Sequence, residues 1–297
     1  MPDALAPVLL DPTELDRTTF ALLDAARITN LPELLETSGL PYKCLFVGEA
    51  QGDLGHVAPW LVELDEESAF TRNLFSSGPA PWHLWDVGGA VLLRTRASFE
   101  RVFSHLRRRL KVQDETGNLV FFRSWDPVQL MTLLTTKAAT AEDLAWLLCD
   151  ADGVVLEHVI CRDGTRCLSA RATSKPAPSP HRLCVTQELR AAFHSAVAAR
   201  AAEQDIAAVR QVLSEADVDL VRAERATLLS LRFRNPDPMR AALCYIAHRG
   251  VGLDGLAPVE REILSAHRQS DFARIRLLRR AVGPWPHPAE MAGDRKR

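Results

Sequence analysis

No part of the sequence forms an apolar run long enough to cross a membrane. A membrane-spanning helix needs roughly 18 or more consecutive, mostly apolar residues, and the chain contains no such run. Its first residues, MPDALAPVLLDPTELD, also lack the basic start and the sustained apolar stretch of a secretory signal peptide. We therefore expect a cytoplasmic protein without a membrane span.

Paired cysteines and clustered histidines are missing as well. The six cysteines are scattered, and no two of them form a C-x-x-C pair. In a chain of this length without an export signal, reduced thiols are the expected state. The nine histidines include no H-E-x-x-H and no Cys/His pair at zinc spacing. The sequence thus predicts neither a disulfide framework nor a metal centre.

Catalytic and nucleotide-binding motifs are absent too. Neither G-x-S-x-G nor a P-loop occurs. GVGLDG at 250–255 matches G-x-G-x-x-G in letters, but a phosphate-binding loop of that type follows a strand and opens a helix. Because the preceding segment has a helical pattern, we interpret it as a helix end followed by a loop. The sequence predicts no cofactor and no catalytic residue; the alternative is an enzyme whose site is assembled from scattered residues.

Neither sign of charge is in large excess, because the 36 Lys and Arg nearly balance the 38 Asp and Glu and leave a formal net charge of -2 at pH 7. No overall field therefore draws the chain to nucleic acid or to anionic lipid. The two halves differ, however: residues 1–150 hold 13 Lys and Arg against 21 Asp and Glu, whereas residues 151–297 hold 23 against 17. An acidic half joined to a basic half favours two domains.

The clearest local signals lie between residues 97 and 134. Apolar residues recur there at the spacing of one helical face, from Phe99 to Leu110. Two short strands, 110–114 and 119–123, are predicted around a turn at Gly117. Asp126 followed by Pro127 is the expected start of another helix, since an N-cap carboxylate and a first-turn proline both favour helix initiation. This stretch indicates scaffold rather than a catalytic motif.

Around that stretch, strand-like runs alternate with helical ones. Residues 18–27 have the pattern of a buried strand that runs into a short helix. Strand character is also present at 42–49, 60–64, 81–95 and 153–170, and 81–95 is expected to form two strands separated by Gly88 and Gly89. This order predicts an α/β N-terminal domain over 1–170, with a mixed sheet and flanking helices. A Pro/Ser-rich linker is expected at 171–183, an all-α helical lobe at 184–283, and a disordered tail at 284–297.

Five short segments resemble, in order, a family of effector adaptors of bacterial type VI secretion systems, also called effector chaperones. The segments are FALLDAAR (20–27), CLFVGE (44–49), VAPWLVEL (57–64), HLRRRL (105–110) and FFRSWDP (121–127). The family has Phe-Tyr where this chain has Ser124 and Trp125. The motif residues that the resemblance singles out, with a structural role expected for them, are Asp24, Arg27, Gly48, Glu49, Pro59, Arg107, Arg123, Trp125, Asp126 and Pro127.

The resemblance implies a non-catalytic protein of the bacterial cytoplasm. It would bind the N-terminal region of a cognate toxin and help load that toxin on the valine–glycine-repeat (VgrG) spike protein. The toxin and the spike are thus the expected partners, with no nucleic acid among them. Aromatic residues anchor many protein interfaces, and the candidate contact residues are Trp82, Trp85, Phe193 and Tyr245.

One weaker alternative comes from a basic run. Seven Lys and Arg residues lie between Arg94 and Lys111, a density that nucleic-acid binding would use with interleaved aromatic residues. The aromatic residues of the run, Phe99 and Phe103, fall instead on the apolar face of the predicted helix. We therefore interpret the run as the solvated back of a helix, with an acidic protein partner or a nucleic acid as the alternatives.

Overall fold

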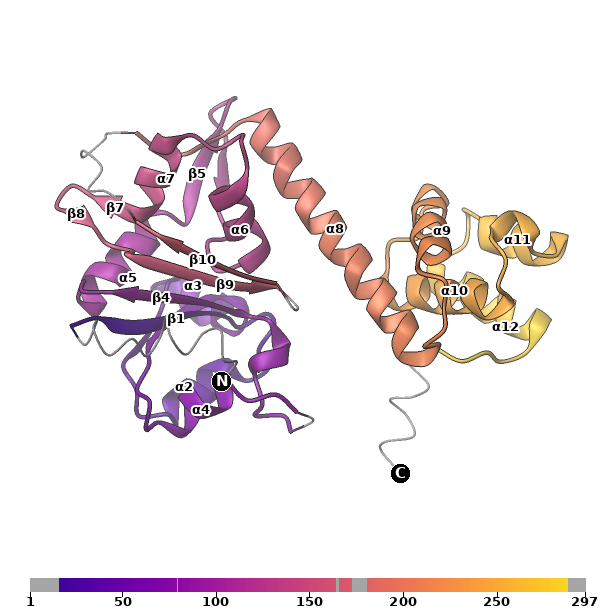
Figure 1. Cartoon of the computed structure of the whole chain (residues 1–297), viewed down its shortest axis with the longest axis horizontal. Coiled ribbons are helices and arrows are strands. Elements are labelled where there is room, and N and C mark those ends of the chain that lie inside the picture. The colour runs from indigo at the N-terminus through magenta and orange to yellow at the C-terminus, as the bar shows by residue number, and fades with distance from the viewer. Residues whose placement is uncertain (1–15, 79, 164–165, 173–180, 288–297) are drawn as a thin grey trace. The chain divides into compact units, whose positions relative to one another are not determined.

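The computed structural model of the chain describes residues 16–78, 80–163, 166–172 and 181–287. The chain divides into two compact units, Met1–Val197 (unit 1) and Ala198–Arg297 (unit 2). Figure 1 shows the strands in unit 1 and only helices in unit 2. Each unit is described by itself.

A six-stranded sheet forms the centre of unit 1, in the order β10-β9-β4-β1-β3-β2. Every neighbouring pair in it is antiparallel. Its strands are β1 (Thr18–Asp24), β2 (Tyr42–Cys44), β3 (Pro59–Glu63), β4 (Ala90–Thr95), β9 (His158–Asp163) and β10 (Arg166–Arg171). The continuous apolar letters of β1 and β4 follow from this order, because both strands lie in the interior of the sheet and are covered on both faces.

Successive side chains of β1 enter two different cores, as the period of a strand requires. Phe20 and Leu22 pack under α5 (Phe99–Arg108), α6 (Pro127–Thr135) and α7 (Ala141–Leu148). Ala21 and Leu23 pack on the other face, against α2 (Leu31–Glu36) and α4 (Ala69–Leu74). Figure 1 shows these two groups of helices on opposite faces of the sheet, so unit 1 is a three-layer structure.

A smaller sheet, in the order β11-β5-β6, adjoins the core under α5 and α6. β5 (Lys111–Asp114) and β6 (Leu119–Phe121) form the predicted hairpin, and β11 (Cys184–Val185) pairs with β5 in parallel. A two-stranded pair, β7 (Cys149–Asp150) and β8 (Gly153–Val154), follows α7. The predicted fold class, α/β followed by all-α, is confirmed. Among the described strands, parallel pairing occurs only between β11 and β5.

Two local predictions differ from the structure. Of the two strands expected in 81–95 only β4 forms, and Trp85–Val87 is a short 3-10 helix. Gly88 follows it with φ 70°, a left-handed conformation that breaks an extended strand. The strand character expected up to residue 49 ends at Cys44, and α3 (Glu49–Leu54) begins after Gly48, whose φ of 63° reverses the chain.

The boundary between the units falls inside the long helix α8 (Gln187–Val212). Leu189 and Phe193, in its first turns, are buried in the core of unit 1. Residues 184–197, assigned to the helical lobe from the sequence, therefore pack with the α/β part. Of the predicted linker, residues 173–180 lie outside the described residues, while Leu183 is buried in the same core.

Unit 2 is helical, as predicted. After the end of α8 it contains α9 (Val218–Ser230), α10 (Pro236–Arg249), α11 (Pro258–Ser265) and α12 (Asp271–Val282). α10 supplies most of its core, including Tyr245, and ends at Gly250 in the left-handed conformation expected of a helix C-cap. The GVGLDG letters thus lie at a helix end, as the sequence analysis proposed.

The segment that follows α12 is part of the core of unit 2. The sequence analysis placed the start of a disordered tail at residue 284. Trp285 is instead buried, packs at a tilted angle against Tyr245 with ring centroids 4.8 Å apart, and donates an Nε1 hydrogen bond of 2.9 Å to the Ala241 carbonyl. An indole buried with its N–H paired anchors a chain end well. Residues 288–297 of the predicted tail lie outside the described residues.

Within the described ranges, no helix is both long and apolar enough to span a membrane.

Candidate functional site

The motif residues of the first and last matching segments meet at the carboxyl end of β1. Asp24 is the last residue of β1 and is buried. Its Oδ2 accepts a hydrogen bond of 3.1 Å from Arg123 Nη2 and lies 3.8 Å from Arg27 Nε. Arg27 Nη2 in turn donates to Asp126 Oδ2 at 3.3 Å. These four residues, here the charge cluster, join two parts of the chain that are 99 positions apart.

The charge cluster is buried on its acidic side and partly open on its basic side. Burial of Asp24 raises its pKa, although the Ala26 N–H and the two arginines favour the ionised form. The guanidinium groups of Arg27 and Arg123 are partly exposed. Water therefore screens these ion pairs, and each contributes little to stability. The arrangement can present two arginine side chains beside the end of β1.

Asp126 has a second role, as the N-cap of α6. Its Oδ1 accepts hydrogen bonds from the Val128 N–H at 2.8 Å and the Gln129 N–H at 3.3 Å. Pro127 occupies the first helical turn. The predicted helix start is therefore confirmed, and one carboxylate both caps α6 and pairs with Arg27.

Two substitutions separate these roles of Asp126. Asn keeps the capping oxygen and removes the charge, whereas Ala removes both. Because a lost N-cap costs about 1 kcal/mol and a screened pair less, we expect Asp126→Ala to lower the free energy of unfolding by about 1–2 kcal/mol and Asp126→Asn by under about 0.5 kcal/mol. Chemical denaturation of both variants checks this. Equal losses would show that the ion pair, not the cap, dominates.

Trp125 lies beside the charge cluster and is buried. The Arg123 guanidinium carbon is 5.6 Å from its ring centroid, and the Phe46 ring packs edge-on at 6.4 Å. Phe46 also contacts Phe121 at 6.1 Å. Ser124, which stands where the resembled family has an aromatic ring, is buried too. The motif segments therefore form one continuous packed region.

The remaining motif residues are divided between this region and the surface. Pro59 pairs with Asp24 in the register of β1 and β3, which places it beside the charge cluster. Gly48 is the N-cap of α3, and Glu49 in its first turn is exposed. Arg107 is exposed on α5. Among the described residues, neither Glu49 nor Arg107 forms a hydrogen bond or an ion pair with the charge cluster.

Of the four aromatic residues proposed as partner contacts, two are accessible. The Trp82 side chain is 53% exposed. Trp85 is partly buried, with the Arg162 guanidinium 4.3 Å above its ring. Phe193 is buried against Phe122, and Tyr245 against Trp285. Burial in the cores of their own units removes Phe193 and Tyr245 as contact residues.

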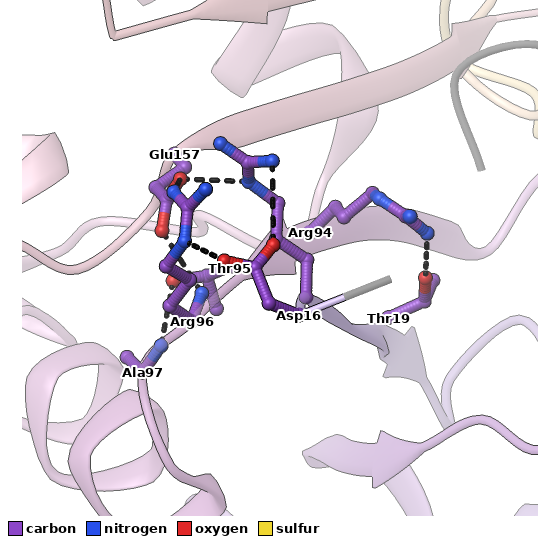
Figure 2. Close-up of polar contacts among 8 residues, drawn as sticks. Asp16, Thr19, Arg94, Thr95, Arg96, Ala97 and Glu157 are labelled. Carbon is purple, nitrogen blue, oxygen red and sulfur yellow. Dashed lines mark hydrogen bonds and ion pairs between the residues drawn. The ribbon is translucent and has the colours of Figure 1, made fainter. Parts of the chain in front are cut away.

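A second polar cluster, which sequence analysis missed, lies at the opposite end of β1. Glu157 accepts from Arg17 Nε at 2.8 Å, from Arg96 Nη1 at 2.7 Å and from the Arg96 backbone N–H at 2.9 Å. Arg96 also pairs with Asp16. Figure 2 shows Glu157 and Asp16 on either side of the Arg96 side chain. The cluster fastens the start of β9 to the ends of β1 and β4.

Two basic side chains at the end of α5, His105 and the C-cap residue Arg109, bind the end of α7. His105 Nε2 lies 2.7 Å from the Leu147 carbonyl oxygen, so Nε2 carries the proton. Arg109 donates to the carbonyls of Trp146 at 2.6 Å, His105 at 3.0 Å and Cys149 at 2.6 Å. Both side chains are buried. They satisfy carbonyls that the end of a helix leaves without intrahelical partners.

These contacts account for much of the basic run. Arg94 and Arg109 are buried, and Arg96 pairs with Glu157. Arg101 forms a two-point pair with Asp150, at 3.0 and 2.7 Å. Phe99 and Phe103 pack against the core, as predicted. The run is therefore partly internal structure, and among the described residues Arg107, Arg108 and Lys111 are its exposed cations without an ion pair.

A large open cavity borders the same helix. It measures about 920 Å³ and lies among the end of α5, the β5–β6 hairpin, the end of α7 and residues 181–184. No group of three or more His, Cys, Asp or Glu side chains that could hold a metal ion occurs within the described part of the chain.

One family model matches the part of the chain that contains the charge cluster. The model of a domain of unknown function (DUF4123) matches residues 19–142. The DUF4123 region thus begins in β1, ends in α7, and includes all five motif segments. The match covers less than half of the chain and leaves out β9, β10 and unit 2. Neither the curated proteins nor the solved structures include a match.

Proposed function

We propose that the chain is a non-catalytic adaptor of a bacterial type VI secretion system. In the cytoplasm it binds a toxin effector by the toxin's N-terminal region and helps load it on the VgrG spike protein. The observation that carries this proposal is the match of DUF4123, a family known for effector adaptors of this secretion system, to residues 19–142. The motif residues that led to the same family from the sequence lie in that region.

The surface of unit 1 supports a protein-binding role. Leu119 is 66% and Phe121 is 57% exposed, and Trp82 is exposed on another loop. Large apolar side chains at a surface favour contacts with a partner, since their burial releases water. An adaptor that shields a toxin before secretion needs such a surface.

A tagged full-length chain, purified from its native bacterium at moderate and high salt, tests the proposal. We expect mass spectrometry to identify one large toxin and a VgrG spike protein, both missing from a purification with an unrelated tagged protein. Deletion of the chain should abolish delivery of that toxin alone, and the restored chain should recover it. Recovery of neither partner would overturn the proposal.

A further inference from the structure

The 920 Å³ cavity of unit 1 has the size of a binding site. Ligand-binding cavities typically measure about 300–1,000 Å³. One wall is the outer face of the β5–β6 hairpin, where Lys111, Gln113, Leu119 and Phe121 lie exposed while Val112 is buried. Lys111, Gln113 and Leu119 line the cavity, together with the buried Val112, and Phe121 is the cross-strand neighbour of Lys111.

The basic side chains that face this cavity are not neutralised. In the described structure, neither Arg108 nor Arg182 has an ion pair or a side-chain hydrogen bond, and both are exposed. The Lys111 ammonium lies 5.4 Å from the Phe121 ring centroid, and none of the described carboxylates pairs with it. Arg109, buried at the base, donates to three carbonyl oxygens and contacts the Trp146 ring, and it has no ion pair among the described residues.

The acidic side chains of the same cavity are mostly occupied. Asp150 is paired with Arg101. Asp114 accepts from the N–H groups of Thr116 and Asn118 in its own turn and pairs with Arg190 at 3.1 Å. Only Asp152, of the three aspartates that line the cavity, has no ion pair within the described residues. The uncompensated charge of the cavity is therefore positive.

We propose that this cavity and the outer face of the β5–β6 hairpin bind an acidic segment of the toxin that also carries apolar side chains. The proposal rests on the proposed function, because it names the chemistry of the segment that the adaptor recognises. Carboxylates of the segment face Arg108, Lys111 and Arg182. Its apolar side chains cover Leu119 and Phe121, and opposite charge guides its approach.

A protein segment fits this surface better than a nucleic acid. A nucleic acid binds with its phosphates along a row of cations. On this surface the cations are interrupted by Asp152 and by the exposed apolar side chains of Leu119 and Phe121. Phe121 already contacts Phe46 and Lys111, so its ring is held in place rather than free to stack on a base. Mixed charge and apolar area is typical of protein interfaces.

A fluorescein-labelled peptide in which glutamate alternates with leucine and phenylalanine is the probe. Its binding to the full-length chain is measured by anisotropy at several salt concentrations. Comparison ligands are the same peptide with lysine for glutamate, the same peptide with serine for its apolar residues, and a single-stranded DNA oligonucleotide. The double variant Arg108→Glu/Arg182→Glu removes the exposed cations. Arg107→Glu, an exposed arginine of the same helix outside the cavity, is the matched control.

We expect the acidic, apolar peptide to bind and to weaken as salt rises. The double variant should bind it about five- to thirtyfold more weakly, since it reverses two uncompensated rim charges. Arg107→Glu should change the affinity less than about threefold, and each altered peptide should bind weakly. Absence of peptide binding, equal losses in the double variant and the control, or tighter binding of the DNA would overturn the proposal.

The pulldown distinguishes failure of the acidic-segment site from failure of the proposed adaptor function. If the double variant still captures the toxin as well as the unaltered chain does, the cavity is not its site and the adaptor function stands. If neither captures a toxin while the peptide still discriminates the variants, the proposed function fails and the acidic-segment site stands.

Discussion

Replacing Asp271 with alanine is expected to lower the free energy of unfolding of unit 2 by about 3–5 kcal/mol, because it leaves Arg274 as a buried, unpaired charge. Arg274 is 1% exposed, and its Nη2 donates to Asp271 Oδ1 at 2.6 Å. Asp271 Oδ2 accepts from the backbone N–H groups of Arg234 at 2.8 Å and Asn235 at 3.0 Å. One carboxylate therefore joins the start of α12 to the loop before α10.

Denaturant unfolding followed by hydrogen exchange of α9 and α10 amides measures this effect in unit 2 alone. Asp219→Ala is the control: Asp219 pairs with Arg222 at 2.9 Å but lies at the surface. We expect Asp219→Ala to lower the free energy of unfolding by less than about 0.5 kcal/mol, as for other exposed ion pairs. A loss at Asp271 no larger than the control would show that Arg274 is solvated in some other way.

Low pH should cause part of the loss in stability of unit 2 that is expected for Asp271→Ala. Although burial opposes ionisation of Asp271, the N–H groups of Arg234 and Asn235 and the Arg274 guanidinium lower its pKa to about 2. A carboxyl whose pKa is lower in the folded state stabilises the fold above its unfolded pKa. Its contribution therefore disappears as the pH falls from about 4 through about 2.

The stability of unit 1 is expected to fall as the pH drops below about 6.5, by up to about 5 kcal/mol, because of His105. Burial, followed by the positive charge of Arg109, lowers the pKa of His105 to about 3. Between about pH 6.5 and about pH 3, His105 binds a proton in the unfolded chain but not in the folded chain, so acid favours unfolding. The slope from this one group reaches about 1.4 kcal/mol per pH unit.

His105→Gln tests this mechanism without removing the contact to α7. A glutamine N–H can still donate to the Leu147 carbonyl, which His105 Nε2 approaches to 2.7 Å, but it does not titrate. The variant should therefore lose this part of the pH slope between about pH 6.5 and 3. His194→Gln, at an exposed position of α8, controls for the substitution. An unchanged slope in His105→Gln would assign the acid sensitivity to other groups.

Local signals predicted the elements that depend on neighbouring residues. The N-cap of Asp126, the apolar face of α5 and the stop of α10 at Gly250 all depend on residues within a few positions of one another. Their physical causes are capping, helical periodicity and a left-handed glycine, which short stretches of sequence display directly. The family resemblance rests on the same short segments.

Contacts between distant residues could not be predicted in this way. Nothing near Asp24 indicates that Arg123 lies beside it, because the register of a sheet decides which distant segments meet. The sequence likewise does not indicate which carbonyl groups accept hydrogen bonds from Arg109, since every residue has a carbonyl group. Trp285 was misjudged for a related reason: its position near the end of the sequence suggested disorder, whereas its indole N–H donates to the carbonyl of the distant Ala241.

The pairing of β9 with β4 has a consequence for the synthesis of the protein. The DUF4123 match ends at residue 142, but β4 gains its second neighbour only from residues 158–163. While the ribosome makes the chain, β1, β3 and β4 emerge first with one edge unpaired. Open strand edges favour aggregation, and pairing across long sequence separations is slow. The nascent chain is therefore expected to depend on general chaperones until residue 163 has left the ribosome.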